Sequence, residues 1–293
     1  MVRPTASRSR AVLIGLALSL LGAPARAATT ADWEVTVAVR LTDGAGTPIA
    51  LRIALPPSDD SQQLGEVEVM ARGLTATVTH DGDEPHVDLR GKLKGSRRVA
   101  VRYTVHRDRT LGTLPVIAPL EAPPPALLPF LMPSPIFQSR SILVRDFLET
   151  NVGPLLETPG QPDLVRILHQ VTREHFPWAA DGKTLTLDVI RSGRGKRIGI
   201  ERVFTTFLRC AHVPARFVEG LNLASTTHRK RVFWTEVWGQ NRWWPLSASS
   251  GWVGRLPKAY IALTRDGQRA LRVEGAVQAS YAIQARPLPE TPS

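Results

Sequence analysis

Alternating apolar and polar residues dominate the first part of the chain. Every second residue is apolar over residues 33–41, and residues 49–55 repeat the alternation. Shorter stretches of the same kind follow at residues 67–69, 74–78, 87–89 and 99–105, with glycine-rich turn sequences between several of them. A period of two is typical of strands with one buried face. About six strands in roughly 80 residues favour an immunoglobulin-like β-sandwich over residues 28–110.

A proline-rich stretch follows at residues 111–138, and we interpret it as a linker. It contains eight prolines, which favour an extended and semi-rigid backbone. It is also rich in leucine, valine and isoleucine. This composition indicates a linker that lies along the surface of a domain and does not hang free in solvent.

Beyond the linker the apolar period changes to that of helices. Residues 139–150, 162–176 and 198–213 each place their apolar side chains on one helical face. Residues 215–220, 232–238 and 242–246 then predict three strands with a short turn before the last. A helix followed by antiparallel strands indicates an α+β domain, which we place at residues 139–286. Residues 287–293 are predicted to be a disordered tail.

The first 27 residues have the features of a cleaved signal peptide. A basic start is followed by the apolar stretch AVLIGLALSLLG at residues 11–22 and by Ala25-Arg26-Ala27. The apolar stretch is shorter than the roughly 20 residues that span a bilayer, and no transmembrane segment is expected in the mature chain. We therefore expect a periplasmic or secreted protein, and export disfavours nucleic acid as a partner.

Positive charge is concentrated in one part of the chain. The formal net charge is +11, and residues 191–231 contain ten basic residues against only Glu201 and Glu219. The histidines show no metal-ligand spacing, so we expect no metal and no cofactor. Cys210 is the only cysteine, which excludes a disulfide within the chain.

Three sequence motifs in the same region resemble those of the bacterial transglutaminase-like family, which has a papain-like cysteine-protease fold. They are LRCAHVPARFVEG at residues 208–220, WTEVW at 234–238 and WWPLS at 243–247. Their order and spacing follow the family pattern well over residues 190–250. The resemblance implies a Cys-His-Asp triad with its cysteine at the start of a helix, where a thiol pKa is lowered.

The three positions that match this triad hold other residues. Arg197 stands at the cysteine position, Val232 at the histidine position and Ser247 at the aspartate position. Arginine is no nucleophile, and valine cannot move a proton. The sequence therefore predicts a catalytically inactive member of the family, a pseudoenzyme. Cys210 lies near the far end of the helix, in a place that the family fills with a small apolar residue, so we expect a buried and unreactive thiol.

Basic residues surround the degenerate triad in the sequence. A helix start and clustered cations both favour anionic ligands. We expect a basic cleft that binds an anionic component of the cell envelope or an acidic protein partner, in a non-catalytic binding or scaffold protein. A solvated basic surface without a ligand explains the same charges equally well. The candidate ligand-binding residues are Arg194, Lys196, Arg197, Arg229, Arg231 and Trp234.

Two other hypotheses remain open at this stage. The chain could be a divergent transglutaminase or amidase that acts on envelope peptides and uses Cys210 with His228. It could also be a purely structural envelope protein. Whether Arg197, Val232 and Ser247 converge in one cleft would discriminate between these hypotheses and the pseudoenzyme.

Overall fold

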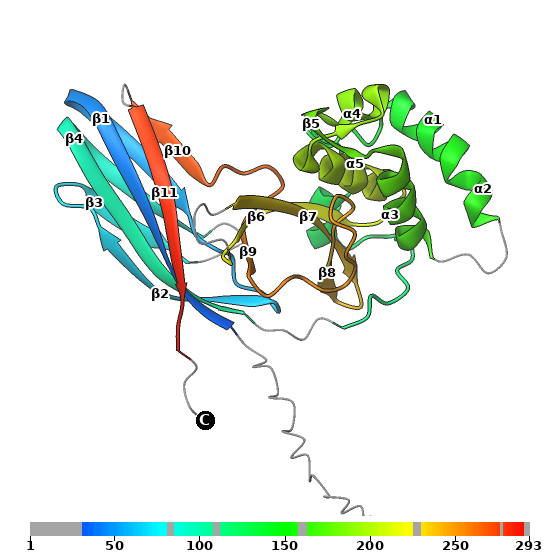
Figure 1. The fold of residues 1–293 in the computed structure, drawn as a ribbon, viewed down its shortest axis with the longest axis horizontal. Helices are drawn as coiled ribbons and strands as arrows, with labels where there is room; N and C mark the ends of the chain where they lie inside the picture. Colours follow the sequence, from blue (N-terminus) through cyan, green and yellow to red (C-terminus); the bar gives the residue numbers. More distant parts are fainter. Residues whose placement is uncertain are drawn as a thin grey trace, which may run out of the picture.

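The computed structural model describes residues 31–80, 85–107, 112–157, 163–224, 230–275 and 278–289. Within them the chain forms two sheets and one group of helices, which is an α+β architecture as the sequence predicts (Figure 1). The expected signal peptide and the last residues of the expected tail lie outside these ranges. Among the described residues no helix combines the length and hydrophobicity needed to cross a membrane.

The first sheet is built around two long antiparallel strands. Strand β1 pairs with β4 along most of its length, with register shifts between Leu41 and Thr47. The sheet order is β10-β1-β4-β2, with β11 also pairing with β1 and β3 with β4. The strands are β1 (Ala31–Ala54), β2 (Gln62–Met70), β3 (Thr75–Thr79), β4 (His86–Arg107), β10 (Leu271–Glu274) and β11 (Gln278–Pro287).

The predicted immunoglobulin-like sandwich is not confirmed. The predicted strands at residues 33–41 and 49–55 are parts of one strand, β1, and those at 87–89 and 99–105 are parts of β4. The sheet is then completed by β10 and β11 from the other end of the chain. Pairing between distant segments leaves no local signature in the sequence, so the alternation shows the strands but not their partners.

Helices and a second sheet form the other part of the molecule, in which the predicted helices and strands are confirmed to within a few residues. The helices are α1 (Ile142–Asn151), α2 (Gly153–Leu156), α3 (Leu164–His175), α4 (Thr186–Ser192) and α5 (Arg197–Cys210). The second sheet has the order β8-β7-β6-β9. Its strands are β6 (Ala215–Asn222), β7 (Lys230–Gly239), β8 (Arg242–Leu246) and β9 (Tyr260–Arg265), and a separate short strand, β5 (Trp178–Lys183), precedes α4.

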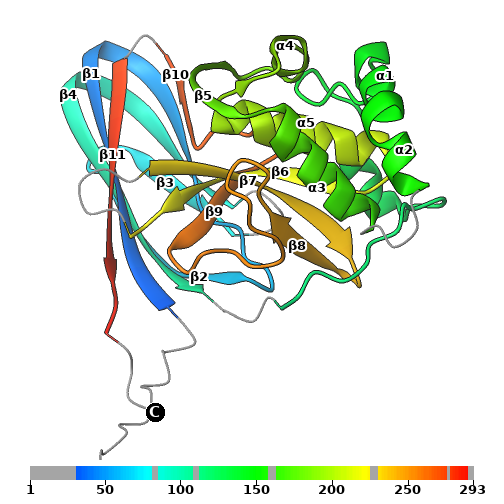
Figure 2. The same cartoon turned by 45° about the vertical axis from the view of Figure 1, so that its right-hand side comes forward.

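Two apolar cores hold these layers together. One lies between the helices and one face of the second sheet, with Phe204 and Phe207 of α5 fully buried against Val237 of β7. The other fills the inner face of the first sheet. Leu221 of β6 and Ile261 of β9 belong to this second core, so the two sheets pack on each other (Figure 2). The first sheet is therefore not a separately packed unit.

The proline-rich segment lies against the helical part of the molecule. Leu114 and Ile117 are buried in the core of the helices, and Leu120 donates its backbone N–H to the carbonyl of His212. A short 3-10 helix, η1 (Pro125–Phe130), buries Leu127. The apolar residues of the linker thus cover the domain that follows it.

A buried glutamine joins the first sheet to the second. The side-chain amide of Gln62 donates to the carbonyls of Pro57 and Ala262, at 2.7 and 3.1 Å. Its Oε1 accepts the backbone N–H of Ala262 at 2.9 Å. Gln62 is only 1% exposed, so no water replaces these hydrogen bonds if the side chain is removed.

We expect Gln62→Ala to lower the free energy of unfolding by about 2 kcal/mol, because it leaves buried peptide groups of Ala262 and Pro57 unpaired. The neighbouring Gln63 is the matched control, since its side chain is exposed and makes one hydrogen bond, to the Asp59 carbonyl. Gln63→Ala should change stability by less than about 0.5 kcal/mol. Urea unfolding of both variants checks this, and equal losses would show that Gln62 does not join the sheets.

Candidate functional site

Helix α5 begins at Arg197, the residue that the sequence pattern predicts at the cysteine position. Its N-cap, Lys196, makes no side-chain hydrogen bond to the helix, and no acidic residue lies in the first turn. Gly199 lies so close to the carbonyl of Lys183 that a Cβ atom there would be 2.4 Å from the oxygen. The start of α5 is therefore packed tightly against the end of β5, and only glycine fits at this point.

The Arg197 side chain is exposed and lies beside two other groups. Its Nη1 donates to the Ser250 hydroxyl at 3.1 Å. Its guanidinium carbon lies 6.0 Å from the centre of the Trp178 ring, at the outer limit of a cation–π contact. Trp178 is 58% exposed, which is unusual for so large an apolar side chain.

One turn further along α5, a buried glutamate holds the segment that contains Ser247. Glu201 is completely buried. Its Oε1 accepts the Ser247 hydroxyl at 2.7 Å and the backbone N–H of Ser249 at 2.9 Å, and its Oε2 lies 3.3 Å from the Thr235 hydroxyl. Burial raises the pKa of Glu201, although these hydrogen bonds work in the opposite direction. Sequence reasoning missed this residue, because a lone glutamate in an apolar helix has no distinguishing motif.

Val232 lies on the other face of strand β7. Thr235 faces α5, since its hydroxyl is 2.9 Å from that of Thr205. Side chains alternate along a strand, which places Val232 and Trp234 on the opposite face. Both belong to a small apolar cluster with Val218 of β6. The structure therefore brings Arg197 to the segment that begins at Ser247, whereas the Val232 side chain packs with Trp234.

Several predicted ligand-binding residues are already engaged within the protein. Arg194 pairs with Asp181 at 3.3 Å, and Arg231 pairs with Glu219 through two contacts of 2.5 and 2.6 Å. Trp234 is 0% exposed and donates its indole N–H to Glu236. Trp234 therefore packs in the core, and the exposed indole beside Arg197 is that of Trp178.

Of the two remaining predicted positions, the structure describes only Lys196. Lys196 is exposed next to Arg197, whereas Arg229 lies outside the described residues. Asp181, which lies outside the basic stretch of residues 191–231, offsets the charge of Arg194, and Glu219 offsets that of Arg231.

Cys210 ends the helix that Arg197 begins. It is partly buried against the apolar core, and burial raises the pKa of its thiol. It lines an apolar pocket of about 690 Å³ together with Leu148 and Leu168. A raised pKa reduces the fraction of thiolate, the nucleophilic form. His228, the partner proposed for it in a divergent enzyme, lies outside the described residues.

Arg209, the first arginine of the motif at residues 208–220, binds the turn between α5 and β6. Arg209 donates from Nε to the Ala215 carbonyl at 2.9 Å and from Nη2 to Asp266 at 2.7 Å. Its guanidinium also stacks on Phe137 at 4.4 Å. Asp266 accepts the backbone N–H of Phe217 as well, at 3.0 Å. Arg209 thereby ties the helix end, the start of β6 and the end of the linker together.

The second motif arginine, Arg216, lies in a buried group of four charges. Its Nε donates to Glu236 at 2.6 Å, and its Nη2 lies 3.6 Å from Asp59. Arg265 pairs with the same Asp59 oxygen and lies 3.9 Å from Glu236. The group is neutral, with two acids and two arginines. Because Asp59 follows β1 and the other three residues lie in the second sheet, these ion pairs connect the two sheets.

The geometry is that of an α+β protein in which the helix α5 is joined to an antiparallel sheet through buried Glu201, which accepts from Ser247, and buried Arg209, which donates to Asp266. Comparison with known families gives this class a name. Residues 156–248 match the profile of the Transglutaminase-like superfamily. This range includes α5, β7 and the segment up to Ser247, so the chain contains a transglutaminase-like domain. No curated protein matches the chain.

Solved structures show how far the fold is shared. A "Putative Cysteine Protease" from Cytophaga hutchinsonii is similar with a TM-score of 0.66 and 12% identity, over 91% of this chain and 93% of that one. At this identity the likeness shows the fold alone, and its coverage includes the first sheet. Two further structures have TM-scores too low to support an argument. One is a "putative protease" from Parabacteroides distasonis, with a TM-score of 0.28 and 12% identity over 72% of this chain and 43% of that one. The other is a "TGase", with a TM-score of 0.30 and 10% identity over 64% of this chain and 47% of that one.

Glu201 should make the stability of the protein depend on pH. With a raised pKa, the folded chain keeps this proton at pH values where the unfolded chain has released it. The contribution of Glu201 to stability therefore falls as pH rises from the ordinary glutamate pKa to the higher folded value. We expect the unfolding free energy of Glu201→Gln, relative to wild type, to increase between about pH 4 and pH 7.

Urea unfolding at several pH values measures this difference. Glu174→Gln, at an exposed position of α3, is the control for the loss of one carboxyl group. If the difference for Glu201→Gln is constant with pH, the Glu201 carboxyl group is not perturbed by burial.

Proposed function

We propose that this protein is an exported, non-catalytic binding or scaffold protein whose transglutaminase-like domain recognises an anionic ligand of the cell envelope. The proposal of export rests on the signal-peptide features of residues 1–27. The proposal of lost catalysis rests on one observation. The helix that should begin with a nucleophile begins with Arg197, and the single cysteine of the chain is the last residue of that helix.

The distance along the helix supports the loss of chemistry. Thirteen residues separate Arg197 from Cys210, which corresponds to roughly 20 Å along the axis. A thiol at the end of a helix gains no help from the helix dipole, which lowers a thiol pKa only at the start. Ser247 has no carboxylate with which to orient a histidine. Its hydroxyl group donates to buried Glu201 instead.

The residues at the start of α5 support the binding role. Lys196 and Arg197 place two cations at a helix end that already favours negative charge and that has no acidic side chain in its first turn. Trp178 adds an exposed aromatic face next to Arg197. A guanidinium beside an indole suits a ligand with a carboxylate or phosphate group and a flat or apolar neighbour.

A divergent enzyme that uses Cys210 is the alternative. Cys210 and His212 both line the apolar pocket of about 690 Å³, which could hold a substrate. The raised thiol pKa disfavours this reading, since papain-like catalysis needs a thiolate.

Binding of poly-L-glutamate to the mature protein tests the proposed site. We expect measurable affinity that decreases as salt is added, because exposed charges are screened. Arg197→Ala and Trp178→Ala should each weaken binding about fivefold, which corresponds to roughly 1 kcal/mol. Isothermal titration calorimetry gives both affinities.

Arg286→Ala is the matched control for Arg197→Ala. It removes the same charge from an exposed position in β11, where Arg286 pairs with Glu34. Its affinity should stay close to that of wild type. If the two arginine variants weaken binding equally, the effect comes from net charge, and the start of α5 is not a ligand site.

A further inference from the structure

The middle of the outer face of the first sheet carries four exposed cations, which we call the basic stripe. Residues with even numbers in β1 and β4 point away from the core, because most of their odd-numbered neighbours are buried. On this face Arg40 of β1 lies directly opposite Arg98 of β4. Lys92 and Lys94 lie further along β4, on either side of Leu93, which is fully buried. Like charges opposite each other on neighbouring strands destabilise a sheet, so the fold alone does not explain this arrangement.

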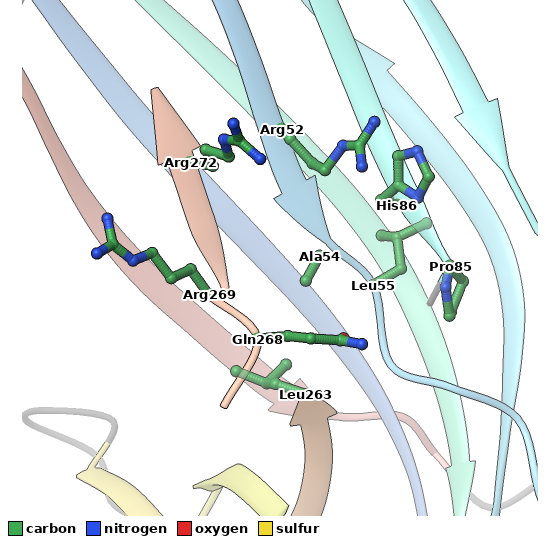
Figure 3. A pocket seen from close by; sticks show the side chains of 9 residues that line it. All are labelled: Arg52, Ala54, Leu55, Pro85, His86, Leu263, Gln268, Arg269 and Arg272. Atoms are coloured by element: carbon green, nitrogen blue, oxygen red, sulfur yellow. The ribbon is translucent and has the colours of Figure 1, made fainter. Parts of the chain in front are cut away.

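The basic stripe differs in its charge balance from both ends of the same face. Within the ranges that the structure describes, none of its four side chains makes an ion pair or a hydrogen bond. Near the end of β1, in contrast, Arg52 donates to Asp88 at 2.8 Å and Arg272 pairs with Glu274 at 2.7 Å (Figure 3). Arg102, toward the other end of the face, also pairs with a glutamate. The charge of the basic stripe is therefore available to a partner from outside.

A hollow of about 510 Å³ opens at the pair of opposed arginines. Ser280 of β11 lies opposite Arg40 in the sheet, so the hollow spans β11, β1 and β4. None of the described residues that line it is acidic. Its polar lining consists of Arg40, Ser96, Arg97, Arg98, Ser280 and Tyr281. Guanidinium and hydroxyl groups are hydrogen-bond donors, which suits the hollow to an anionic group.

The shape of this face suits an extended chain. Two residues along a strand span about 6.6 Å, so Lys92 and Arg98 lie roughly 20 Å apart along β4. Beside the arginine pair the surface is low, because Ala38 lies between Ala100 and Ala282 of the neighbouring strands. The sheet also curls around its core, which makes the outer face convex (Figure 2). A flexible chain can follow a convex face, whereas a flat bilayer would contact only part of it.

We propose that the basic stripe binds a linear polyanion, a chain that carries a phosphate or carboxylate group on each repeat. The chain lies along β4, with one anionic group in the hollow at Arg40 and Arg98. Guanidinium groups present paired donors that match both kinds of oxyanion, and lysines add charge without a fixed geometry. The bound anion offsets the repulsion between the opposed arginines. This surface lies on the first sheet and does not depend on the site proposed at the start of α5.

Titration of the mature protein with long-chain polyphosphate and, separately, with polygalacturonate tests the surface and distinguishes the two kinds of oxyanion. We expect saturable binding of at least one polymer in isothermal titration calorimetry, with an affinity that falls as salt is added. Arg40→Gln/Arg98→Gln should lose about tenfold or more in affinity. For polyphosphate, the slope of log Kd against log salt concentration should also decrease by about 1.4, because each phosphate contact with a single-stranded polyanion contributes about 0.7.

The control removes equal charge from the same face. Arg52→Gln/Arg272→Gln changes two arginines that already have carboxylate partners, and it should bind within about twofold of wild type. Equal losses in the two double variants, or saturable binding of neither polymer, would overturn the proposal. A larger loss in Arg197→Ala than in Arg40→Gln/Arg98→Gln would place the polymer at the start of α5 and also overturn it. Tighter binding to phosphatidylglycerol vesicles than to either polymer would point to a membrane surface instead.

Discussion

The buried ion pairs among Asp59, Arg216, Glu236 and Arg265 are the constraint on which the rest of the structure depends. Arg216 and Glu236 belong to neighbouring strands of the second sheet, and Asp59 comes from the loop after β1. Removing one member of such a group leaves an unpaired buried charge, which costs about 3–5 kcal/mol. The position of the first sheet is therefore fixed by the ion pairs of Asp59 with arginines of the second sheet, one of which, Arg216, belongs to the family motif.

On the other face of the second sheet, the buried polar side chain of Glu201 likewise holds two elements together. Its carboxyl group binds the segment at Ser247 to α5, one turn from Arg197. Arg209 does the same at the other end of the helix through Asp266. The motif residues that remain thus stabilise the fold, and this explains how the fold can persist without the Cys-His-Asp triad that we propose was lost.

The sequence predicted the elements well where the pattern is local. Helix α3 has a clear apolar face and Asp163 as its N-cap, and α5 begins at Arg197, one residue before its predicted start. Pairing across the chain was not predictable, since nothing in residues 271–287 indicates β1 as their partner. The ion pairs between strands could not be predicted for the same reason. Arg231 was predicted to bind a ligand in a basic cleft, and only the pairing of β6 with β7 shows that Glu219 lies beside it.

The pH dependence of Cys210 alkylation tests the loss of catalysis most directly, because any cysteine chemistry must use this single thiol and no substrate needs to be known. The native, mature protein would be treated with iodoacetamide across a range of pH, and the rate would be followed by mass spectrometry. The structure predicts a rate that stays low at neutral pH and rises only above the ordinary thiol pKa, because burial raises the pKa of Cys210. Rapid alkylation that is already at its plateau below about pH 7 would reveal a stabilised thiolate and contradict the account.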